Sequence, residues 1–371
     1  MMGVIQFKIW RDLWENKART LQVVLIIAMG AFAVGMIITT RNLLIPGMEQ
    51  IWQASDPATI NLYADPRVDD DTITALKSVE GVADVEGSAS DSLEWRLSPD
   101  DPWSAGRFIA RADYEDQKYT KLEILSGNWP QDKFFAIGQG TDTAYGIHEG
   151  SQVYIRIGDR EHVVTINGIL YDPVIQPPSF GGPAQFYATR DRLGDLTGDR
   201  NFNLIMAGTT FEYDEAKAQL VADKMQRKLE KQGVDSGGAS PTGGRVTDPH
   251  KHFFQDPMDG LFTVLQIMAI LALILGLFLV YNTITAIIAQ QTNQIGIMKA
   301  VGAKWWQILL VYLANVLAYG VLALIIAMPL GIIAGWYLNL FLMAAFNAEP
   351  GPFIIPGEAI RARGVSRNGF V

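Results

Sequence analysis

Few residues of this chain could carry chemistry, and they do not form a recognisable catalytic set. His250 and His252 form an H-x-H pair that would share one face of a strand and could bind a metal ion. The chain has no cysteine and no further histidine cluster, so a polar segment ahead of a membrane span explains the pair better. The sequence also lacks the Walker A motif G-x-x-x-x-G-K-[ST] and the nucleophile motif G-x-S-x-G. We therefore predict a protein that is not an enzyme and that binds no metal or cofactor of its own.

The stretch QTNQIGIMKAVGAKWWQ, residues 291–307, is a short polar interruption between two long apolar runs. Within it Ile295, Met298 and Val301 recur at helical spacing, which predicts a short helix with an apolar stripe. Gly302 could end that helix in the left-handed conformation. Such a helix could dock in a groove of a soluble partner, or it could be a plain connecting turn, and residue types alone leave both readings open.

Long uncharged runs predict a membrane protein. They cover Thr20–Thr40, Gly260–Ala289 and Trp305–Ala348. About 20 helical residues cross a hydrocarbon core of about 30 Å, so each run is long enough to span it. The first run follows basic residues, as a signal peptide would. It is too long for one and ends without a small-x-small cleavage site, so we predict a retained anchor.

The third run is longer than one straight span needs. It has about 44 residues, or roughly 66 Å as a helix. The run is therefore either one long helix kinked at Pro329 or a tight hairpin of two spans. Gly331 and Gly335 form a small-xxx-small spacing near that proline, which suits close helix packing.

Basic residues near the ends of the runs predict the orientation. Lys17 and Arg19 precede the first run, and Lys299 and Lys304 separate the second run from the third. Both regions should be cytoplasmic, so the N-terminus lies inside and the acidic segment after the first run lies outside. The net charge of -9, with no basic face, argues against a nucleic-acid partner.

Residues 1–19 predict an amphipathic helix on the inner membrane surface. Apolar side chains recur there at helical spacing, charged residues take the other side, and tryptophans are typical of headgroup depth. The residues that we assign to this surface helix are Trp10, Leu13, Trp14, Lys17 and Arg19.

The segment between the first two runs predicts an α+β domain. Short alternating stretches such as QVYIRIG and EHVVTINGILYD predict strands, and Asp71–Val79 and Tyr213–Gln232 predict helices. The Gly/Ser/Pro-rich stretch GVDSGGASPTGGRVTDP predicts a flexible linker into the second span. The apolar stripe of the second helix comprises Ala218, Val221, Met225 and Leu229.

Three stretches resemble one family. QQTNQIGIMKAVGAKWWQI looks like the signature of FtsX/MacB-type ABC transporter permeases, Q-R-x-x-E-I-G-I-L-[KR]-A-[LI]-G-A, although Gln294 stands where the family has an acid. WRDLWENKARTLQVVLIIAMGAFAVGMI is similar to the family's N-terminal surface helix and first span. LEILSGNWPQDKFFAIGQGTDTAYGIHEGSQVYIRIGDREHVVTINGILYDP resembles its MacB-type periplasmic core domain, which accompanies an FtsX-like transmembrane domain. The family normally has four spans, and we expect the last transmembrane helix to be missing here.

The resemblance implies a permease subunit that relays the ATP-driven motion of a separate ATPase subunit to the extracytoplasmic domain, for export or extraction of a substrate. ATP would be bound by that cytoplasmic ATPase, which would dock on the polar stretch. The resemblance also implies a bacterial inner membrane location and a second permease chain in a homo- or heterodimer. An extracytoplasmic adaptor protein is a further candidate partner. The matching residues, taken as ATPase-coupling residues, are Gln291, Ile295, Gly296, Ile297, Met298, Lys299, Ala300, Gly302 and Ala303.

The expected fold is a membrane α-helical protein with three transmembrane helices, or four if the third run is a hairpin. A large α+β extracytoplasmic domain is inserted after the first helix. An alternative function is a membrane-anchored binding, sensory or scaffold module without an ATPase partner, which leaves the motif in the polar stretch unexplained. The expected segments are the surface helix 1–19, the first transmembrane helix 20–44, the MacB-like core domain 45–258, the second transmembrane helix 259–290, the coupling segment 291–304, the third helix or hairpin 305–348 and the tail 349–371.

Overall fold

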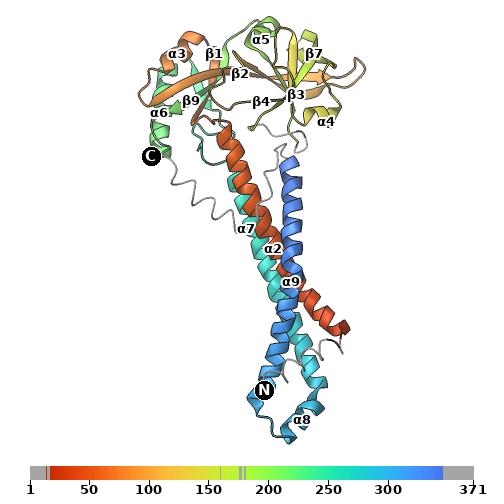
Figure 1. Ribbon diagram of the computed structural model, residues 1–371. Helices are drawn as coiled ribbons and strands as arrows, with labels where there is room; N and C mark the ends of the chain where they lie inside the picture. Colours follow the sequence, from red (N-terminus) through yellow and green to blue (C-terminus); the bar gives the residue numbers. More distant parts are fainter. Residues whose placement is uncertain (1–13, 15–16, 159, 175–177, 179–180, 346–371) are drawn as a thin grey trace. The chain divides into compact units, whose positions relative to one another are not determined.

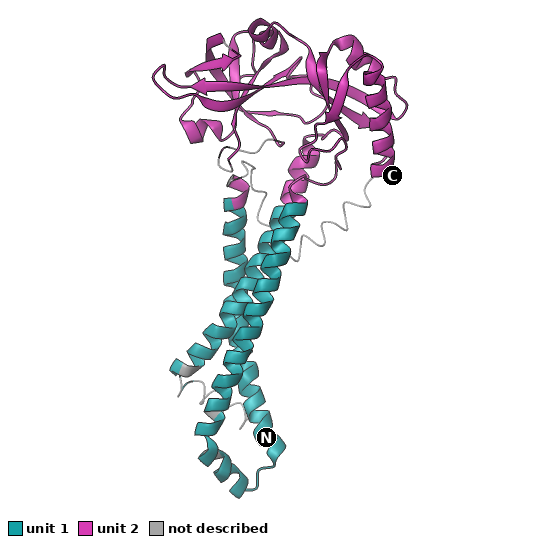
Figure 2. Ribbon diagram, turned by 180° about the vertical axis from the view of Figure 1, so that it is seen from behind, with its two compact units in different colours: residues 1–45, 256–341, 351–371 teal, residues 46–255, 342–350 magenta. Residues whose placement is uncertain are grey.

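The computed structural model describes residues 14, 17–158, 160–174, 178 and 181–345, and the chain divides into two compact units. Unit 1 contains the residues up to Ile45 and Asp256–Phe341, drawn in teal in Figure 2. Unit 2 contains Pro46–Gln255 and the described residues after Phe341, drawn in magenta. Most of the predicted surface helix 1–19 and the whole predicted tail 349–371 lie outside the described residues.

Unit 1 consists of long apolar helices. They are α2 (Lys17–Ala54), α7 (Gln255–Gln290) and α9 (Trp305–Ala345), and the short helix α8 (Thr292–Ala300) lies between the last two (Figure 1). The part of α2 from Pro46 on and the part of α9 after Phe341 belong to unit 2. Each long helix contains a stretch that is long and apolar enough to cross a membrane. A helix suits lipid because it satisfies its backbone hydrogen bonds internally. The predicted helical membrane part is thus confirmed, and the third run is one helix through Pro329 rather than a hairpin.

Unit 2 is built on a mixed ten-stranded sheet. The hydrogen-bonded order is β10-β1-β9-β2-β3-β8-β5-β7-β4, and β6 pairs with both β2 and β7. Because β6 joins these two, strands β2, β3, β8, β5, β7 and β6 close into a ring. The strands are β1 (Ile60–Val68), β2 (Val82–Arg96), β3 (Ser104–Arg111), β4 (Glu123–Gly127), β5 (Phe134–Gly138), β6 (Gln152–Ile157), β7 (Arg160–Tyr171), β8 (Ala184–Thr189), β9 (Phe202–Thr209) and β10 (Asp235–Gly238).

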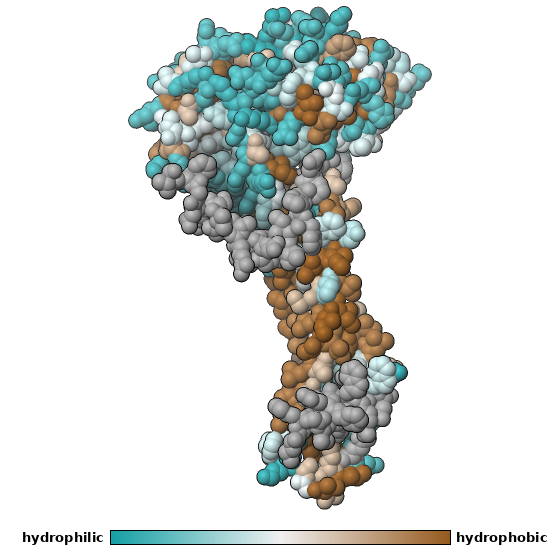
Figure 3. All heavy atoms as spheres, in the orientation of Figure 1, coloured by the Kyte–Doolittle hydropathy of each residue, from teal (hydrophilic) through white to brown (hydrophobic). Residues whose placement is uncertain are grey.

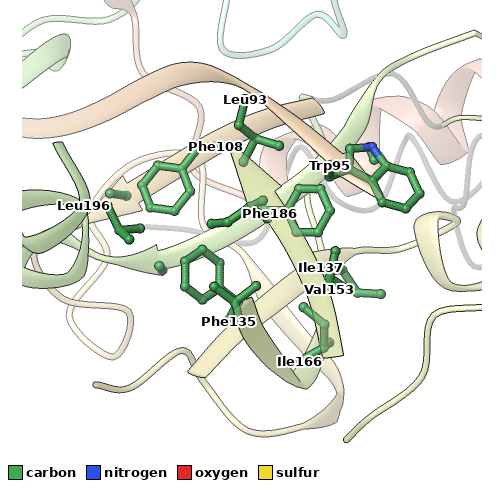
Figure 4. Packing of buried hydrophobic residues seen from close by; sticks show 14 of the residues in the cluster. Leu93, Trp95, Phe108, Phe135, Ile137, Val153, Ile166, Phe186 and Leu196 are labelled. Atoms are coloured by element: carbon green, nitrogen blue, oxygen red, sulfur yellow. The ribbon is translucent and has the colours of Figure 1, made fainter. Parts of the chain in front are cut away.

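The main core of unit 2 is formed mostly by side chains from the strands of the ring, joined by Ile147 and by Leu193 and Leu196 of α5 (Arg190–Thr197) (Figure 4). Phe108, Phe135 and Phe186 come from three different strands and are fully buried together. On β6, Val153 and Ile155 are both buried, as expected when alternate residues of a strand face one side. A closed ring of strands with an aromatic core gives the domain a stiff centre.

Helices cover the rest of the sheet. A second core lies where α3 (Asp70–Leu76) and α6 (Glu215–Glu230) pack on β1, β2 and β9. The apolar stripe predicted on α6 is confirmed, because all four of its residues are buried. Asp214 caps this helix, since its side chain accepts the Lys217 N–H. The remaining helices are α4 (Thr141–Tyr145) and α5 (Arg190–Thr197).

Unit 2 differs in places from the sequence expectations, and for two of these differences the structure shows the physical reason. Strand β2 was not predicted because its middle is small and polar, and Gly87 there makes room for the ring of Phe202. The predicted flexible linker is wrong, because part of it forms β10, which pairs with β1. Val246, further along the same stretch, bridges to Ile60. The glycines and serines that suggested a linker thus lie along the edge of the sheet.

The end of α2 is held in unit 2 by an aromatic cluster. Trp52 is fully buried, with its ring against His252 and Phe253 at centroid distances of 5.3 and 5.7 Å. Its indole N–H donates to the Asp248 carbonyl, 3.3 Å away. The Nδ1 atom of His252 accepts the Phe254 N–H at 3.1 Å. His252 therefore packs as a core residue and does not share an open face with His250.

This buried histidine predicts a pH dependence of stability. Burial lowers the pKa of His252 to about 4, so the unfolded chain binds a proton there more readily than the folded chain does. The free energy of unfolding should therefore fall as pH drops from about 6.5 towards 4, by up to about 3 kcal/mol. Thermal unfolding of the solubilised chain, followed by tryptophan fluorescence, measures this. His252→Gln should flatten that part of the profile, whereas the exposed His250→Gln should not. An equally steep profile in His252→Gln would refute the assignment.

Candidate functional site

The polar stretch forms a turn between α7 and α9 that is closed by backbone hydrogen bonds. At the end of α8 the Gly302 N–H donates to the Lys299 carbonyl, and the Ala303 N–H donates to the Met298 carbonyl, both at 3.0 Å. This is the Schellman arrangement, with its glycine in the left-handed region. The φ of Gly302 is 95°, so the predicted left-handed stop is confirmed.

Side chains on both sides of α8 hold this turn in place. The Tyr312 hydroxyl of α9 donates to Gln291 Oε1 at 2.9 Å, which ties the start of α8 to α9. Gln307 Oε1 accepts the Lys304 N–H at 2.9 Å and so caps the start of α9. Gln291 was expected to couple to an ATPase, and the structure gives it a bracing contact within the chain. Tyr312 was not singled out, although a lone hydroxyl in an apolar run signals a need for a partner.

Helix α8 has two unlike sides. Ile295 and Met298 are half-buried, whereas the side chain of Ile297 is 65% exposed and that of Val301 is 85% exposed. The predicted stripe is therefore wrong at Val301, because α8 ends at Ala300 and the chain turns there. The free apolar face is formed by Ile297 and Val301, which lie about one turn apart.

The other predicted coupling residues on this stretch are small or basic. Gly296, Lys299 and Ala300 are exposed, and Ala303 is half-buried. A Cβ atom placed on Gly296 would meet nothing within 4 Å. A glycine inside a helix costs about 0.5–1 kcal/mol relative to alanine, and no contact in the described part of the chain requires it. With Lys304 also exposed and no acid between residues 260 and 348, the turn presents positive charge.

The small residues near Pro329 lie in the contact between α2 and α9. Pro329 is inside α9, two residues before Gly331. A Cβ on Gly331 or Gly335 would come within 3.1 or 2.8 Å of a backbone oxygen of α2, and the built Cβ of Gly35 lies 3.8 Å from the Gly331 Cα. The Thr40 hydroxyl donates to the Gly335 carbonyl at 3.2 Å. These residues allow the two backbones to approach closely.

Of the residues predicted for the N-terminal surface helix, Trp10 and Leu13 lie outside the described residues. Trp14 is helical and exposed, and the Lys17 ammonium lies 4.4 Å from the centroid of its ring, within cation–π range. Arg19 belongs to α2.

Unit 2 offers no comparable site among its described residues. No group of three or more metal-ligating side chains occurs in the described part of the chain. An open cleft of about 710 Å³ is lined largely by charged side chains at the start of α5. Arg190 there is paired with Asp70, and Arg200 is paired with Asp191, so much of its charge is already balanced. The turn that carries α8 is therefore the candidate functional site.

One comparison with known protein families gives a match in this part of the chain. Residues 266–360 match the family model of the FtsX-like permease C-terminal domain, and α8 lies inside the matched range. The resemblance first noted in the polar stretch is thereby confirmed for this part of the chain. No curated protein sequence gives a significant match.

Solved structures that are similar to the chain overlap it over about half its length. The extracellular domain of the noncanonic ABC-type transporter YknZ from Gram-positive bacteria has 17% identity and a TM-score of 0.34, covering 48% of this chain and 100% of that one. The periplasmic region of MacB from Actinobacillus actinomycetemcomitans has 9% identity and a TM-score of 0.35, covering 50% and 89%. A domain of a permease protein from Porphyromonas gingivalis has 12% identity and a TM-score of 0.31, covering 50% and 88%.

Because Gly302 has a left-handed backbone conformation, its substitution should destabilise the turn locally. Gly302→Ala should destabilise the turn by about 1–2 kcal/mol, because a Cβ is strained at positive φ. Gly296→Ala is the matched control. Its Cβ enters open space and its helix propensity is better, so α8 should become slightly more stable. Hydrogen exchange of the amides of residues 298–303 measures both effects. Unchanged protection in Gly302→Ala would contradict the cap.

Proposed function

We propose that this chain is the permease subunit of an ABC transporter of the MacB/FtsX type. A separate cytoplasmic ATPase subunit binds α8 and the following turn. Its ATP-driven motion passes through the long helices to unit 2, which acts on a substrate or partner outside the membrane, in export or extraction. The chain itself contains no Walker A motif, so nucleotide hydrolysis belongs to the partner.

One observation carries the docking assignment. Ile297 of α8 and Val301, directly after the helix, present apolar side chains beside Gly296, and no described residue of the chain covers them. An exposed glycine in the middle of a helix lowers helix stability, so its presence is explained best by a partner surface that approaches the backbone closely. The family match over residues 266–360 supports a permease, and ABC permeases act with an ATPase.

The structure of α2 supports the relay. It is one continuous helix from Lys17 to Ala54, and its residues from Pro46 on belong to unit 2. Directly after it, the Ser55 carbonyl accepts the Lys121 N–H at 2.7 Å, and the Asp56 carbonyl accepts the Thr120 N–H at 3.0 Å. A displacement of the end of α2 is thus passed to the loop that contains these two donors.

That loop is in turn held to the ring of strands by a buried ion pair. Arg111 of β3 is 4% exposed and pairs with Glu86 of β2 at 3.1 Å. The same guanidinium donates to the Tyr119 and Thr120 carbonyls, and Glu86 Oε2 accepts the N–H groups of Lys118 and Tyr119. Breaking a buried pair by removing one partner typically costs about 3–5 kcal/mol, so this connection is stiff.

The orientation follows from the same proposal. The N-terminus and α8 lie in the cytoplasm, as their basic residues favour, and unit 2 lies outside a bacterial inner membrane. A membrane-anchored binding or sensory module would share the helices and unit 2. This alternative does not explain why Gly296 and the apolar side chains of Ile297 and Val301 are exposed.

The docking assignment predicts loss of the partner on substitution of α8. Gly296→Trp combined with Ile297→Asp should abolish co-purification of an ATPase, because one change blocks close approach and the other places a charge on the apolar face. A Cβ on Gly296 would meet nothing within 4 Å, and the side chain of Ile297 is exposed. The double variant should therefore still fold.

Thr292→Asp is the matched control for that experiment. It adds the same charge to α8 about 140° around the helix from Ile297, at the N-terminal turn where an acid is tolerated. This variant should retain the ATPase. Equal ATPase recovery from the double variant and the wild type would place the docking site elsewhere.

A second copy or paralogue of the permease should pair through the first two spans. Met29 of α2 and Leu275 of α7 are exposed apolar side chains in this part of unit 1, as is Ile325 on α9. The chain has no cysteine, so a single introduced cysteine is the only possible crosslinking site. Met29→Cys and Leu275→Cys should each crosslink to a dimer, whereas Ile325→Cys should not. Crosslinking that yields only monomers beside a bound ATPase would contradict the pairing.

A further inference from the structure

We infer that the docking surface for the ATPase extends beyond α8 onto the first turns of α9, with Trp305 and Trp306 as its anchors. The occupant is a soluble subunit that offers an apolar pocket edged by acidic side chains. This inference rests on the proposed function, because it names a second contact of the same partner.

The levels of the three long helices within unit 1 decide where these tryptophans lie. Gly30 of α2 lies against Leu273 of α7, with a built Cβ 3.1 Å from the leucine Cδ1. Further along, the Arg41 Nη2 atom lies 2.8 Å from Asp259 Oδ1. At the other end of the contact, Val23 packs with residues of both α7 and α9 in one buried cluster. These contacts show which residues of the three helices lie at the same level along the bundle.

Polarity changes at matching levels on α2 and α7. At one end lies the ion pair of Arg41 with Asp259, and at the other end α2 returns to polar residues at Thr20, about 32 Å away along the helix. That distance fits a hydrocarbon core of about 30 Å. Near the level of Thr20, α7 carries Tyr281 and Asn282. The inner boundary of the core therefore lies at this level.

Helix α9 continues well past that boundary. Tyr319 belongs to the buried cluster with Val23, and Trp305 is fourteen residues further towards α8, roughly 21 Å along the helix. About 5 Å of this brings the chain to the level of Thr20, and a headgroup layer takes about 5–8 Å more. Trp305 and Trp306 therefore lie beyond the lipid, where the usual role of tryptophan as an interfacial anchor does not apply.

The same part of α9 presents a contiguous apolar surface. Trp305 is 71% exposed and Trp306 is 46% exposed, and Leu309 and Leu310 follow them as exposed residues. Figure 3 shows hydrophobic side chains on the surface at the end of unit 1 that carries α8. Buried tryptophans are frequent hot spots of protein interfaces, and apolar area of this kind in water calls for a protein cover.

The positive charge beside the tryptophans indicates what kind of partner surface fits here. The turn next to the tryptophans carries the exposed Lys304, and Lys299 lies on α8, while no acid occurs between residues 260 and 348. A second copy of this segment would bring four lysines together without a counter-charge, so like-charge repulsion disfavours it. A pocket with acidic side chains at its edge complements both the tryptophans and the lysines.

Cysteine labelling tests the inference directly, since the chain has no native cysteine. Trp305→Cys and Leu309→Cys are expressed with and without the ATPase that co-purifies with the wild-type chain. They are then treated with a membrane-impermeant maleimide in inside-out vesicles. We expect labelling without the ATPase and at least about fivefold slower labelling with it. Leu275→Cys, at mid-membrane, should stay unlabelled in both.

Substitution gives an independent readout. Trp305→Ala with Trp306→Ala should weaken ATPase binding at least tenfold with α8 intact, as expected for hot-spot tryptophans. Trp336→Ala, near the other end of the span, should not.

Three labelling results would overturn the inference. No labelling without the ATPase would place the tryptophans in lipid. Equal labelling with and without it would leave the surface uncovered, and the docking of α8 could still stand if Gly296→Trp with Ile297→Asp abolishes binding. Protection that depends on the concentration of the chain alone would assign the surface to a second copy. If no ATPase binds the wild-type chain, the proposed function fails together with this inference.

Discussion

The close approach of α2 and α9 is the contact on which the rest of unit 1 depends. Lipid offers helices no hydrophobic reason to associate, so packing and hydrogen bonds between backbones must hold them together. Gly331 and Gly335 leave room for the backbone of α2, and Thr40 adds a hydrogen bond to the Gly335 carbonyl. Any side chain larger than hydrogen at Gly335 would meet α2 backbone at 2.8 Å.

This contact also fixes the register of the bundle. Because α9 is one helix of 41 residues, a level set at Gly331 is carried without a break to Trp305. The proline at position 329 removes one backbone hydrogen bond, yet the helix continues through it, close to the glycines. The position of α8 relative to the N-terminal end of α2 thus follows from a packing contact far from it.

The sequence predicted those parts of the fold whose signals are local. Apolar runs reveal the long helices, and the stripe on α6 needs only a helical period of 3.6 residues. Strand β2 could not be found in this way, because the residues in its middle are small and polar and carry no alternating apolar pattern. The closure of six strands into a ring depends on β6 meeting both β2 and β7, a long-range pairing that no local pattern encodes.

The candidate site was predicted in the same uneven manner. The left-handed stop at Gly302 follows from residue type and position, and the structure has it. The side of α8 that is free could not be read from spacing, because it depends on where the helix ends and on what lies against it. Val301 was therefore assigned to the wrong stripe. The contact of Gln291 with Tyr312 was missed for a related reason, since it joins residues of two helices across the turn.

In the proposed function the turn transmits force between the chain and a partner, and such a turn must already have its bound shape. Binding that orders a flexible loop loses free energy to conformational entropy, and a soft loop would also absorb the displacement that it should pass on. Here three separate devices fix the turn: the Gly302 stop, the Gln307 cap and the Tyr312 brace. None of them uses Ile297 or Val301, so the apolar pair stays free for a partner while the backbone beneath it is held. This separation of the holding residues from the contacting residues is what a preformed docking element requires.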